Sequence, residues 1–142
     1  MKIRRARLSD SKAIWLIRNH PEIRKNSFNE KPISFKKHKE WFGDYFKNKN
    51  NICFLLEDKK RVLGYCRFDL KNKQREVSIA ILPKFQKGGL GSFLLQKCIK
   101  RLKNKNNLIA IIKIKNQLSF SFFQKNSFKI KRKNKNKYYL IY

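Results

Sequence analysis

Apolar residues recur every three or four positions in four stretches of the chain, and this spacing predicts amphipathic helices. The four stretches are residues 10–20, 34–49, 90–102 and 117–125. The expected apolar face of the second stretch is largely aromatic and consists of Phe35, His38, Trp41, Phe42 and Tyr45.

Polar residues and a proline set the expected limits of the first two helices. Ser9 or Asp10 can cap the first helix, and Ser34 can cap the second. Pro21 disfavours the α conformation in the residue before it, so the first helix should end there. Residues 21–33 are then expected to form a loop.

Other segments are short and rich in β-branched, aromatic or consecutive apolar residues, which predicts strands. They are residues 2–7, 52–57, 61–69, 76–82, 108–114, 128–131 and 138–142. The element order is therefore βααβββαβαββ. The strand–helix–strand run from 76 to 114 implies one right-handed parallel crossover. We expect an α/β (α+β) fold with a mixed, mostly antiparallel sheet, in a single domain over residues 1–142.

The composition agrees with a globular protein of the cytoplasm. Hydrophobic residues make up 41% of the 142 positions, which is enough to form one core. The longest apolar stretch, residues 108–112, is too short for a membrane span, and the N-terminus lacks the apolar segment of a secretory signal. Cys53, Cys66 and Cys98 have no paired spacing, so we expect reduced thiols and no metal site.

The formal net charge of +28 is unusual, and three explanations compete for it. They are nucleic-acid binding, an anionic substrate or cofactor, and a compositional bias toward lysine. Lysine far outnumbers arginine, and Lys-Asn runs recur at 47–51, 103–107 and 133–137 in expected turns. RNA-binding surfaces usually rely on arginine for two-point contacts. The pattern favours compositional bias first, a small anion second and nucleic acid last.

A glycine-containing segment, LPKFQKGGLGS at residues 82–92, lies between an expected strand and an expected helix. Gly88, Gly89 and Gly91 have no Cβ, so the backbone there can approach an anion closely. The helix that begins near Leu90 adds the positive end of its dipole. These features predict a diphosphate site built from backbone N–H groups. The segment is neither a Walker loop nor a GxGxxG motif, and a turn that binds nothing is the other interpretation.

The spacing Gln86-x-x-Gly89-x-Gly91 resembles the acetyl-CoA loop of GNAT acetyltransferases, and the element order resembles theirs over nearly the whole chain. The resemblance implies an N-acetyltransferase that uses acetyl-CoA and no metal. It also implies that the strand ending at Ile81–Leu82 splays from the strand at 108–114, where its backbone N–H groups bind the pantetheine arm. The implied cofactor-binding residues are Ile81, Leu82, Gln86, Lys87, Gly88, Gly89, Leu90, Gly91 and Ser92.

The segment from Asn116 to Phe128 resembles a second GNAT motif, Asn-x-x-(Ala/Ser)-x-x-x-Tyr-x-x-x-Gly-Phe. The resemblance implies that Asn116 and Ser119 line the CoA arm. It places Phe123 in the cofactor site where the family usually has a tyrosine, and phenylalanine has no proton to give to the leaving thiolate. Ser127 likewise stands where the family usually has glycine.

Acetyl transfer to an amine needs no protein nucleophile, but the amine must lose a proton. Glu76 opens the strand that leads into the glycine loop, at a position from which GNAT enzymes often act as a base through water. Ser78 shares its face and can relay a proton. Asp69 can hold a cationic amine, and Tyr138 or Tyr139 can protonate the thiolate. Each residue also suits a structural role at a strand end or turn.

The acceptor is expected to bind between the first two helices. Arg18, Asn19, His20 and Arg24 surround a proline turn there, and His38 and Trp41 follow on the next helix. The pattern resembles acetyltransferases for nucleotide-linked amino sugars, in particular the N-acetyltransferase step of pseudaminic acid synthesis. It implies a UDP-linked 4-amino-deoxysugar. The two arginines suit its diphosphate, Asn19 and His20 its hydroxyls, and Trp41 a ring face.

Other acceptors and roles stay open at this point. Protein N-acetylation is the alternative within the fold, and a non-enzymatic RNA-binding module is the alternative outside it. His38 on an apolar helix face also suits a buried core histidine. We expect a monomer or homodimer that binds acetyl-CoA and a small amine, and no nucleic acid.

Overall fold

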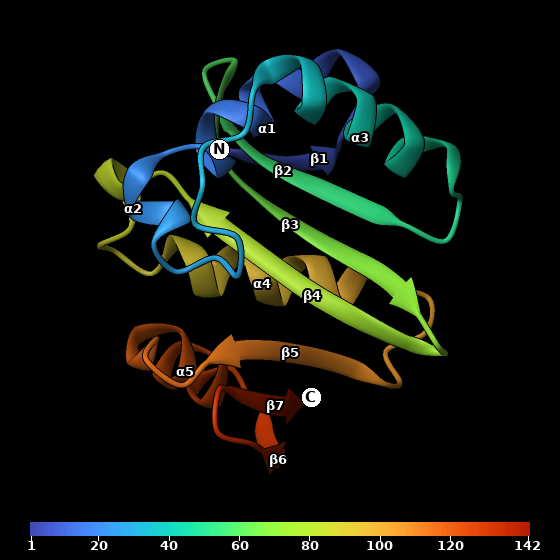
Figure 1. The fold of residues 1–142 in the computed structure, drawn as a ribbon. Helices are drawn as coiled ribbons and strands as arrows, with labels where there is room; N and C mark the ends of the chain where they lie inside the picture. Colours follow the sequence, from blue (N-terminus) through green and yellow to red (C-terminus); the bar gives the residue numbers. More distant parts are fainter.

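The computed structural model describes residues 1–142 and shows one sheet of seven strands packed between helices (Figure 1). The strands are β1 (Lys2–Arg5), β2 (Ile52–Asp58), β3 (Arg61–Lys71), β4 (Gln74–Ile81), β5 (Leu108–Lys113), β6 (Lys129–Lys133) and β7 (Lys137–Ile141). The helices are α1 (Ser11–Arg18), α2 (Pro21–Arg24), α3 (Phe35–Lys47), α4 (Leu90–Arg101) and α5 (Gln117–Lys125). Apart from α2, the element order is the predicted one.

The sheet is mixed, with the strand order β1-β2-β3-β4-β5-β7-β6. Only β4 and β5 are parallel, and α4 connects them as the predicted crossover requires. Two residue pairs alone, Arg75–Leu108 and Glu76–Ile109, join these two strands. Beyond them β4 and β5 diverge toward their carboxyl ends (Figure 1). The predicted splay is confirmed, and it begins right after Glu76. We call it the β4–β5 wedge.

Helices cover both faces of the sheet and form two cores. On one face α1 and α3 pack over the central strands, with a core that includes Ile14, Ile17, Phe42, Leu55 and Tyr65. On the other face α4 and α5 lie over a larger core that includes Phe68, Leu94, Leu95, Phe123 and Leu140. Successive residues of β3 point to alternate faces, so its odd-numbered residues from Tyr65 to Lys71 lie on the α1–α3 face.

The segment after α1 differs from the predicted loop, because Pro21–Arg24 form the short helix α2. Proline suits the first turn of a helix, where an N–H would have no intrahelical partner. The Glu22 N–H donates to the His20 Nδ1 atom at 3.2 Å, so His20 caps this helix. A helix of one turn has no apolar periodicity, and the sequence therefore did not reveal it.

The predicted caps of the first two helices had different outcomes. The cap of α1 by Ser9 or Asp10 is wrong, since no side chain accepts a hydrogen bond from its first turn. Asp10 instead binds the Arg4 guanidinium, with both of its oxygens accepting at 2.8 Å. The Ser34 cap is confirmed, because its Oγ accepts from the Lys37 N–H at 3.2 Å.

β2, β3 and β4 form two consecutive hairpins with two-residue turns. Lys59 and Lys60 form the first turn and Asn72 and Lys73 the second, all with positive φ. β3 and β4 are both longer than predicted as a result. The pairing of β3 with β4 places the acidic side chains of Asp69 and Glu76 opposite each other near the start of the wedge.

Three further features of the fold bear on the expected class of protein. No helix has both the length and the apolar character that a membrane crossing requires. The three cysteines are free and buried. No group of three or more His, Cys, Asp or Glu side chains is placed to hold a metal ion.

Candidate active site

The glycine loop exposes backbone at the start of α4. Gly89 precedes the helix with a φ of 79°, and Gly88 has a φ of 133°. Both values lie in the left-handed region, which favours glycine, although a Cβ at either position would meet no other atom. The glycines are therefore needed for their conformation. They form an exposed turn from which the first N–H groups of α4, which have no intrahelical partner, are accessible.

Gln86 connects the glycine loop to the strand before it. Its side-chain amide donates to the Ile81 carbonyl oxygen at 2.9 Å, and the Leu82 N–H donates to the Leu63 carbonyl oxygen at 2.9 Å. Lys87 is exposed in the same loop. The side chain of Gln86 thus orders the loop and leaves its backbone available to a ligand.

Gly91 and Ser92 contact α5 from the first turn of α4. A Cβ at Gly91 would come within 3.1 Å of the Phe122 ring, and the Ser92 Oγ accepts from the Asn126 side-chain amide at 3.0 Å. Asn126 is buried and also bonds Gln96 at 3.2 Å. These contacts hold α5 beside the N-terminal end of α4. The sequence did not point to Asn126.

The residues of the second motif lie at the start of α5. The Asn116 Oδ1 accepts from the Ser119 N–H at 3.1 Å, and its Nδ2 donates to the Ser119 Oγ at 2.8 Å. Phe123 is buried, and its ring meets Phe122 and Phe128 edge to face. Phe123 therefore belongs to the apolar core and supplies no proton.

The predicted proton-transfer residues lie on the α1–α3 face where the wedge begins. Glu76 is the cross-strand neighbour of Asp69, and Ser78 is the neighbour of Arg67. Glu76 accepts from the Lys71 Nζ at 3.0 Å, and Ser78 accepts from Arg67 at 3.4 Å. One Asp69 oxygen lies 3.6 Å from Arg67, while the other is buried without a partner. The structure thus brings Glu76, Ser78 and Asp69 together.

Tyr138 lies apart from this group. It is opposite Ile112 in the β5–β7 ladder, and Ile112 belongs to the larger core under α4 and α5. Its ring centre is 4.3 Å from that of Phe120. Tyr138 therefore faces α5, on the opposite side of the sheet from Glu76 and Ser78.

The turn after α1 uses its polar side chains to order the chain that follows. The Asn19 Oδ1 accepts from the Ile33 N–H at 2.9 Å. Arg24 donates to the carbonyl oxygens of Asn19 and Glu30 at 3.0 and 3.1 Å. In this conformation Asn19, His20 and Arg24 maintain the turn, so an acceptor would have to replace or share these contacts.

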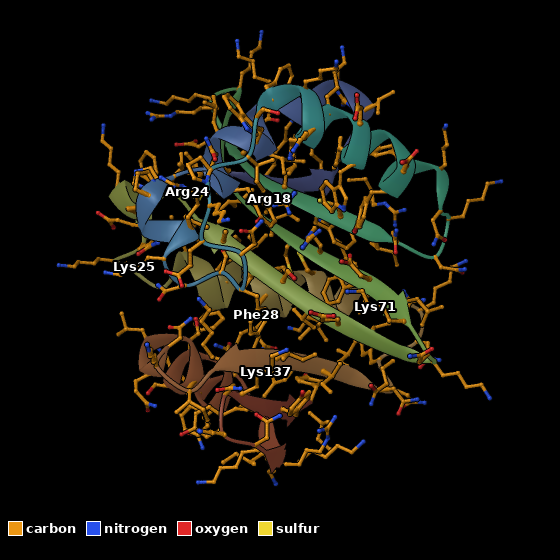
Figure 2. The ribbon with its side chains drawn as sticks, viewed as in Figure 1. Arg18, Arg24, Lys25, Phe28, Lys71 and Lys137 are labelled. Atoms are coloured by element: carbon orange, nitrogen blue, oxygen red, sulfur yellow. The ribbon has the colours of Figure 1, made fainter.

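The loop between α2 and α3 extends over the sheet toward β5 and β7 (Figure 2). Glu30 accepts from the Lys113 Nζ at 3.1 Å, and the Lys137 ammonium lies 4.6 Å from the centre of the Phe28 ring. Lys113 and Lys137 are cross-strand neighbours. These two contacts, which we call the loop latch, connect the acceptor side of the molecule to the far side of the wedge.

A cavity of 510 Å³ opens beside the predicted proton-transfer residues, between α1, α3 and β3. Its lining includes Arg18, Trp41, Arg67 and Asp69. The guanidinium carbons of Arg18 and Arg67 lie 4.6 and 4.9 Å from the centre of the Trp41 ring. Stacking of a sugar on Trp41 would therefore require one guanidinium to move. Sequence reasoning missed Arg67, although a charged residue inside an apolar strand, two positions before Asp69, was an available signal.

His38 lies on the same helix as Trp41 but is fully buried. Its two ring nitrogens have no hydrogen-bond partner, and its ring stacks on Phe42 with centres 5.9 Å apart. Burial, together with the nearby charge of Arg18, lowers the pKa of His38 to about 4. The ring is thus neutral at pH 7, and its burial keeps it out of reach of an acceptor in this conformation.

The sequence and the fold both resemble those of known acetyltransferases. The model of the acetyltransferase (GNAT) family matches residues 14–128, which include the glycine loop, the wedge and α5. Among curated protein sequences, none matches this chain.

Solved structures with the same fold cover nearly the whole chain. An N-acetyltransferase from Staphylococcus aureus Mu50 is 25% identical, with a TM-score of 0.81 over 98% of this chain and 95% of that one. Ribosomal-protein-alanine N-acetyltransferase from Brucella melitensis is 19% identical, with a TM-score of 0.80 over 99% and 98%. The acetyltransferase yncA from Salmonella typhimurium, solved with its cofactor acetyl-CoA, is 21% identical, with a TM-score of 0.81 over 99% and 91%.

Proposed function

Because this chain belongs to the acetyltransferase (GNAT) family, we propose that it acetylates the primary amine of a nucleotide-linked sugar, a UDP-linked 4-amino-deoxysugar used in surface glycans. Its general activity follows from the family: it is an N-acetyltransferase, and acetyl-CoA is its cosubstrate. We place the reaction in the cytoplasm, where free thiols such as those of Cys53, Cys66 and Cys98 stay reduced.

This proposal rests mainly on the charge of the sheet face that bears α1 and α3, where the acceptor is expected to bind. Figure 2 shows Arg18, Arg24, Lys25, Lys71 and Lys137 spread over the face that bears α1 and α3. The carboxylates of Glu30, Asp69 and Glu76 on this face are each already paired with a lysine or arginine. A polycationic acceptor, such as a polyamine or a basic peptide, would meet excess positive charge there. An acceptor that carries a diphosphate would be attracted.

The β4–α4 loop and the wedge fit acetyl-CoA. The turn at Gly88 and Gly89, with the free N–H groups of α4, can bind the diphosphate. After Glu76, the backbone groups of β4 that point away from β3 have no partner strand. They can therefore bind the amide groups of the pantetheine arm. Acetyl-CoA supplies the activated acetyl thioester, and the protein positions the amine beside it.

The acidic residues at the start of the wedge suit removal of the amine proton. We assign Glu76 as the proton acceptor through water, with Ser78 on the same strand face as the relay. Asp69 lines the cavity beside them, which suits it to orient the ammonium group before deprotonation. Phe123 has no exchangeable proton, so the leaving thiolate takes its proton from water or a tyrosine outside the core.

Release of the CoA thiol, followed with DTNB, tests the proposed acceptor. UDP-4-amino-deoxysugars and basic peptides are compared in parallel, and we expect turnover with the sugar nucleotide alone. A Gly89→Trp variant is the control for the cofactor site, because a side chain is strained at a φ of 79°. That variant should lose both CoA binding and turnover.

The other outcomes point to other functions. Turnover with basic peptides alone would contradict the sugar proposal and assign protein N-acetylation. No turnover, together with no CoA binding by calorimetry, would contradict the assigned roles of the loop and wedge. A salt-sensitive complex with RNA that persists in the Gly89→Trp variant would then favour a binding module.

A further inference from the structure

One end of the acceptor-side cavity is lined by two arginines from different elements. Arg18 belongs to the last turn of α1 and Arg67 to the middle of β3, and both guanidiniums lie against the Trp41 ring. We propose that Arg18 and Arg67 form a second anion site, which binds a phosphoryl group of the acceptor. This inference rests on the proposed function and gives the diphosphate of the acceptor a location.

Among the cations that line this cavity, Arg18 is the one without an ion-pair or hydrogen-bond partner. No carboxylate and no hydrogen-bond acceptor of the protein contacts it, and its neighbour is the face of the Trp41 ring at 4.6 Å. It is half-buried, and burial together with the positive charge of Arg67 lowers its pKa. An anion bound there would compensate both the burial and the repulsion.

Arg67 is held more firmly than Arg18. Its side chain is 16% exposed and lies 3.6 Å from an Asp69 oxygen. Burial disfavours its charge, but the pKa of Arg67 is still raised, chiefly because of the negative charge of Asp69. Its Nε is buried without a partner. Arg67 is therefore a fixed positive charge at the inner end of the cavity, with part of its donor capacity unused.

The acidic residues that line the cavity do not neutralise this pair. Asp69 is engaged with Arg67. Asp44 is exposed at the cavity rim and forms no ion pair within the chain. Lys71, the third cation of the lining, is bound to Glu76. The excess positive charge thus lies at the Arg18 end, beside Trp41.

The location separates this site from the phosphate site of the cofactor. The β3 residues that line the cavity, from Arg67 to Lys71, lie opposite the first half of β4, whereas the glycine loop follows the end of β4. The volume of 510 Å³ is that of a small-molecule site. Arg24, which the sequence suggested as the second phosphate ligand, donates to backbone carbonyl oxygens instead.

Calorimetry on the protein saturated with CoA tests the site, because CoA then occupies the glycine loop. UDP and inorganic pyrophosphate are the anionic probes, citrate is the carboxylate probe and uridine is the neutral control. About 0.15 M salt screens unspecific attraction to the net charge of +28. We expect UDP and pyrophosphate to bind, and citrate and uridine to bind at least about tenfold more weakly.

Substitutions locate the binding. Arg18→Gln should weaken UDP binding at least about tenfold, the loss of one charge-assisted contact. Arg67→Gln should have a similar effect. Since it leaves Asp69 unpaired, the charge-conserving Arg67→Lys is measured beside it, and circular dichroism verifies the fold of both. The matched control is Lys36→Gln, which removes one exposed positive charge from α3, the helix of Trp41.

Two results would overturn the site: unchanged UDP affinity in Arg18→Gln, or equal weakening in Arg18→Gln and Lys36→Gln. The second result would mean that UDP responds only to overall charge. These experiments distinguish failure of the anion site from failure of the proposed function. UDP binding that needs Arg18, without turnover of any UDP-amino sugar, would keep the site and refute the function. Turnover of a UDP-amino sugar with a KM that Arg18→Gln leaves unchanged would support the function and refute the site.

Discussion

At Ser127 the chain adopts a backbone conformation that few side chains tolerate. Its φ is 73°, in the turn between α5 and β6. The GNAT motif that this segment resembles usually has glycine at the same position. A residue with a Cβ in the left-handed region costs roughly 1–2 kcal/mol relative to a relaxed conformation. The serine therefore keeps the turn at some loss of stability.

Ser127→Gly should stabilise the protein by about 0.5–1 kcal/mol, because relief of the backbone strain exceeds the added freedom of the unfolded chain. Urea denaturation measures this as a higher midpoint with an unchanged slope. Ser121→Gly is the matched control, since Ser121 is exposed within α5. The control should lose roughly 0.5 kcal/mol. A lower midpoint for Ser127→Gly would contradict the argument.

His38 makes the folded protein sensitive to mild acid. Its pKa is about 4 in the folded state and about 6.5 in an unfolded chain. Between these values the unfolded state binds the proton more readily, so stability falls as the pH drops through this window. His38→Phe keeps the stacking on Phe42 and removes the titration. Its urea midpoint should therefore change less between pH 7 and pH 5 than that of the wild type, and equal changes would refute this role.

Glu76 is assigned to proton removal, so its charge should matter for kcat more than for KM. Glu76→Gln should lower kcat by about 100-fold, the usual scale of general-base catalysis, and flatten the acid side of the pH–rate profile. Lys71→Gln is the control, because it frees the carboxylate of Glu76 without removing it. A Glu76→Gln variant with a wild-type profile would assign the proton to Asp69 or to water.

The sequence predicted the position of the glycine loop and the start of α4 near Leu90. Both depend on neighbours within a few positions. Arg67 was missed because its role depends on Arg18 and Trp41, which are distant in sequence. Arg24 was assigned to the acceptor because the residues around Pro21 resemble those of amino-sugar acetyltransferases and an arginine suits a diphosphate. Its actual partners are carbonyl oxygens that only the folded loop brings near.

At the scale of elements, the turns of the two central hairpins contain lysines that are poorly suited to a backbone with positive φ. Two-residue hairpin loops with positive φ at both positions favour Asn followed by Gly. The chain has Lys59–Lys60 in one turn and Asn72–Lys73 in the other, with φ values between 49° and 66°. The strands, which pair over their whole lengths, must therefore impose these turns.

Lys73→Gly should stabilise the β3–β4 hairpin by about 1 kcal/mol, because it replaces a strained lysine next to an asparagine that already suits its position. Thermal unfolding measures the effect, with an expected rise in Tm of roughly 3–4 °C for a chain of this size. Lys103→Gly, an exposed lysine outside any helix or strand, is the control and should show no gain. A decrease in Tm for Lys73→Gly would mean that Lys73 makes a stabilising contact.

The element order was predictable because apolar periodicity is a local property, and the long strands and helices each extend over enough residues to show it. α2 was not predictable, since one turn leaves no period. The bounds of β3 and β4 depended on pairing between strands, which extended both elements into the predicted turn. The Ser34 cap was predicted correctly from a local pattern. The Asp10 cap was wrong because Arg4, on a different element, binds that carboxylate.

At the scale of the whole molecule, the backbone pairing between the two sides of the wedge is short, and the larger core under α4 and α5 joins them. Two residue pairs join β4 to β5, and the loop latch adds one exposed ion pair and one cation–aromatic contact. Exposed pairs contribute little free energy, typically below about 1 kcal/mol. Ligands that contact both sides of the wedge should therefore stabilise the fold by binding.

The net charge of +28 should make stability rise with salt. Repulsion among the cations destabilises the compact state, and added salt screens it. The exposed ion pairs that salt also weakens are individually worth little. Raising NaCl from about 0.05 to 0.5 M should therefore stabilise the protein by on the order of 1 kcal/mol, or roughly 3–4 °C in Tm. An equal osmolality of sorbitol is the control, and a Tm that falls with NaCl would show that the ion pairs dominate.

Both free edges of the sheet are basic. β1 at one edge has the sequence KIRR, and β6 at the other has KIKRK with every residue exposed. An unpaired edge strand is a template for another chain, but a second copy would place its own cations alongside the first. Edge-to-edge growth into fibrils is therefore opposed by electrostatic repulsion. The same lysines that make the composition unusual protect the protein from self-templated aggregation, and polyanions that neutralise them would remove that protection.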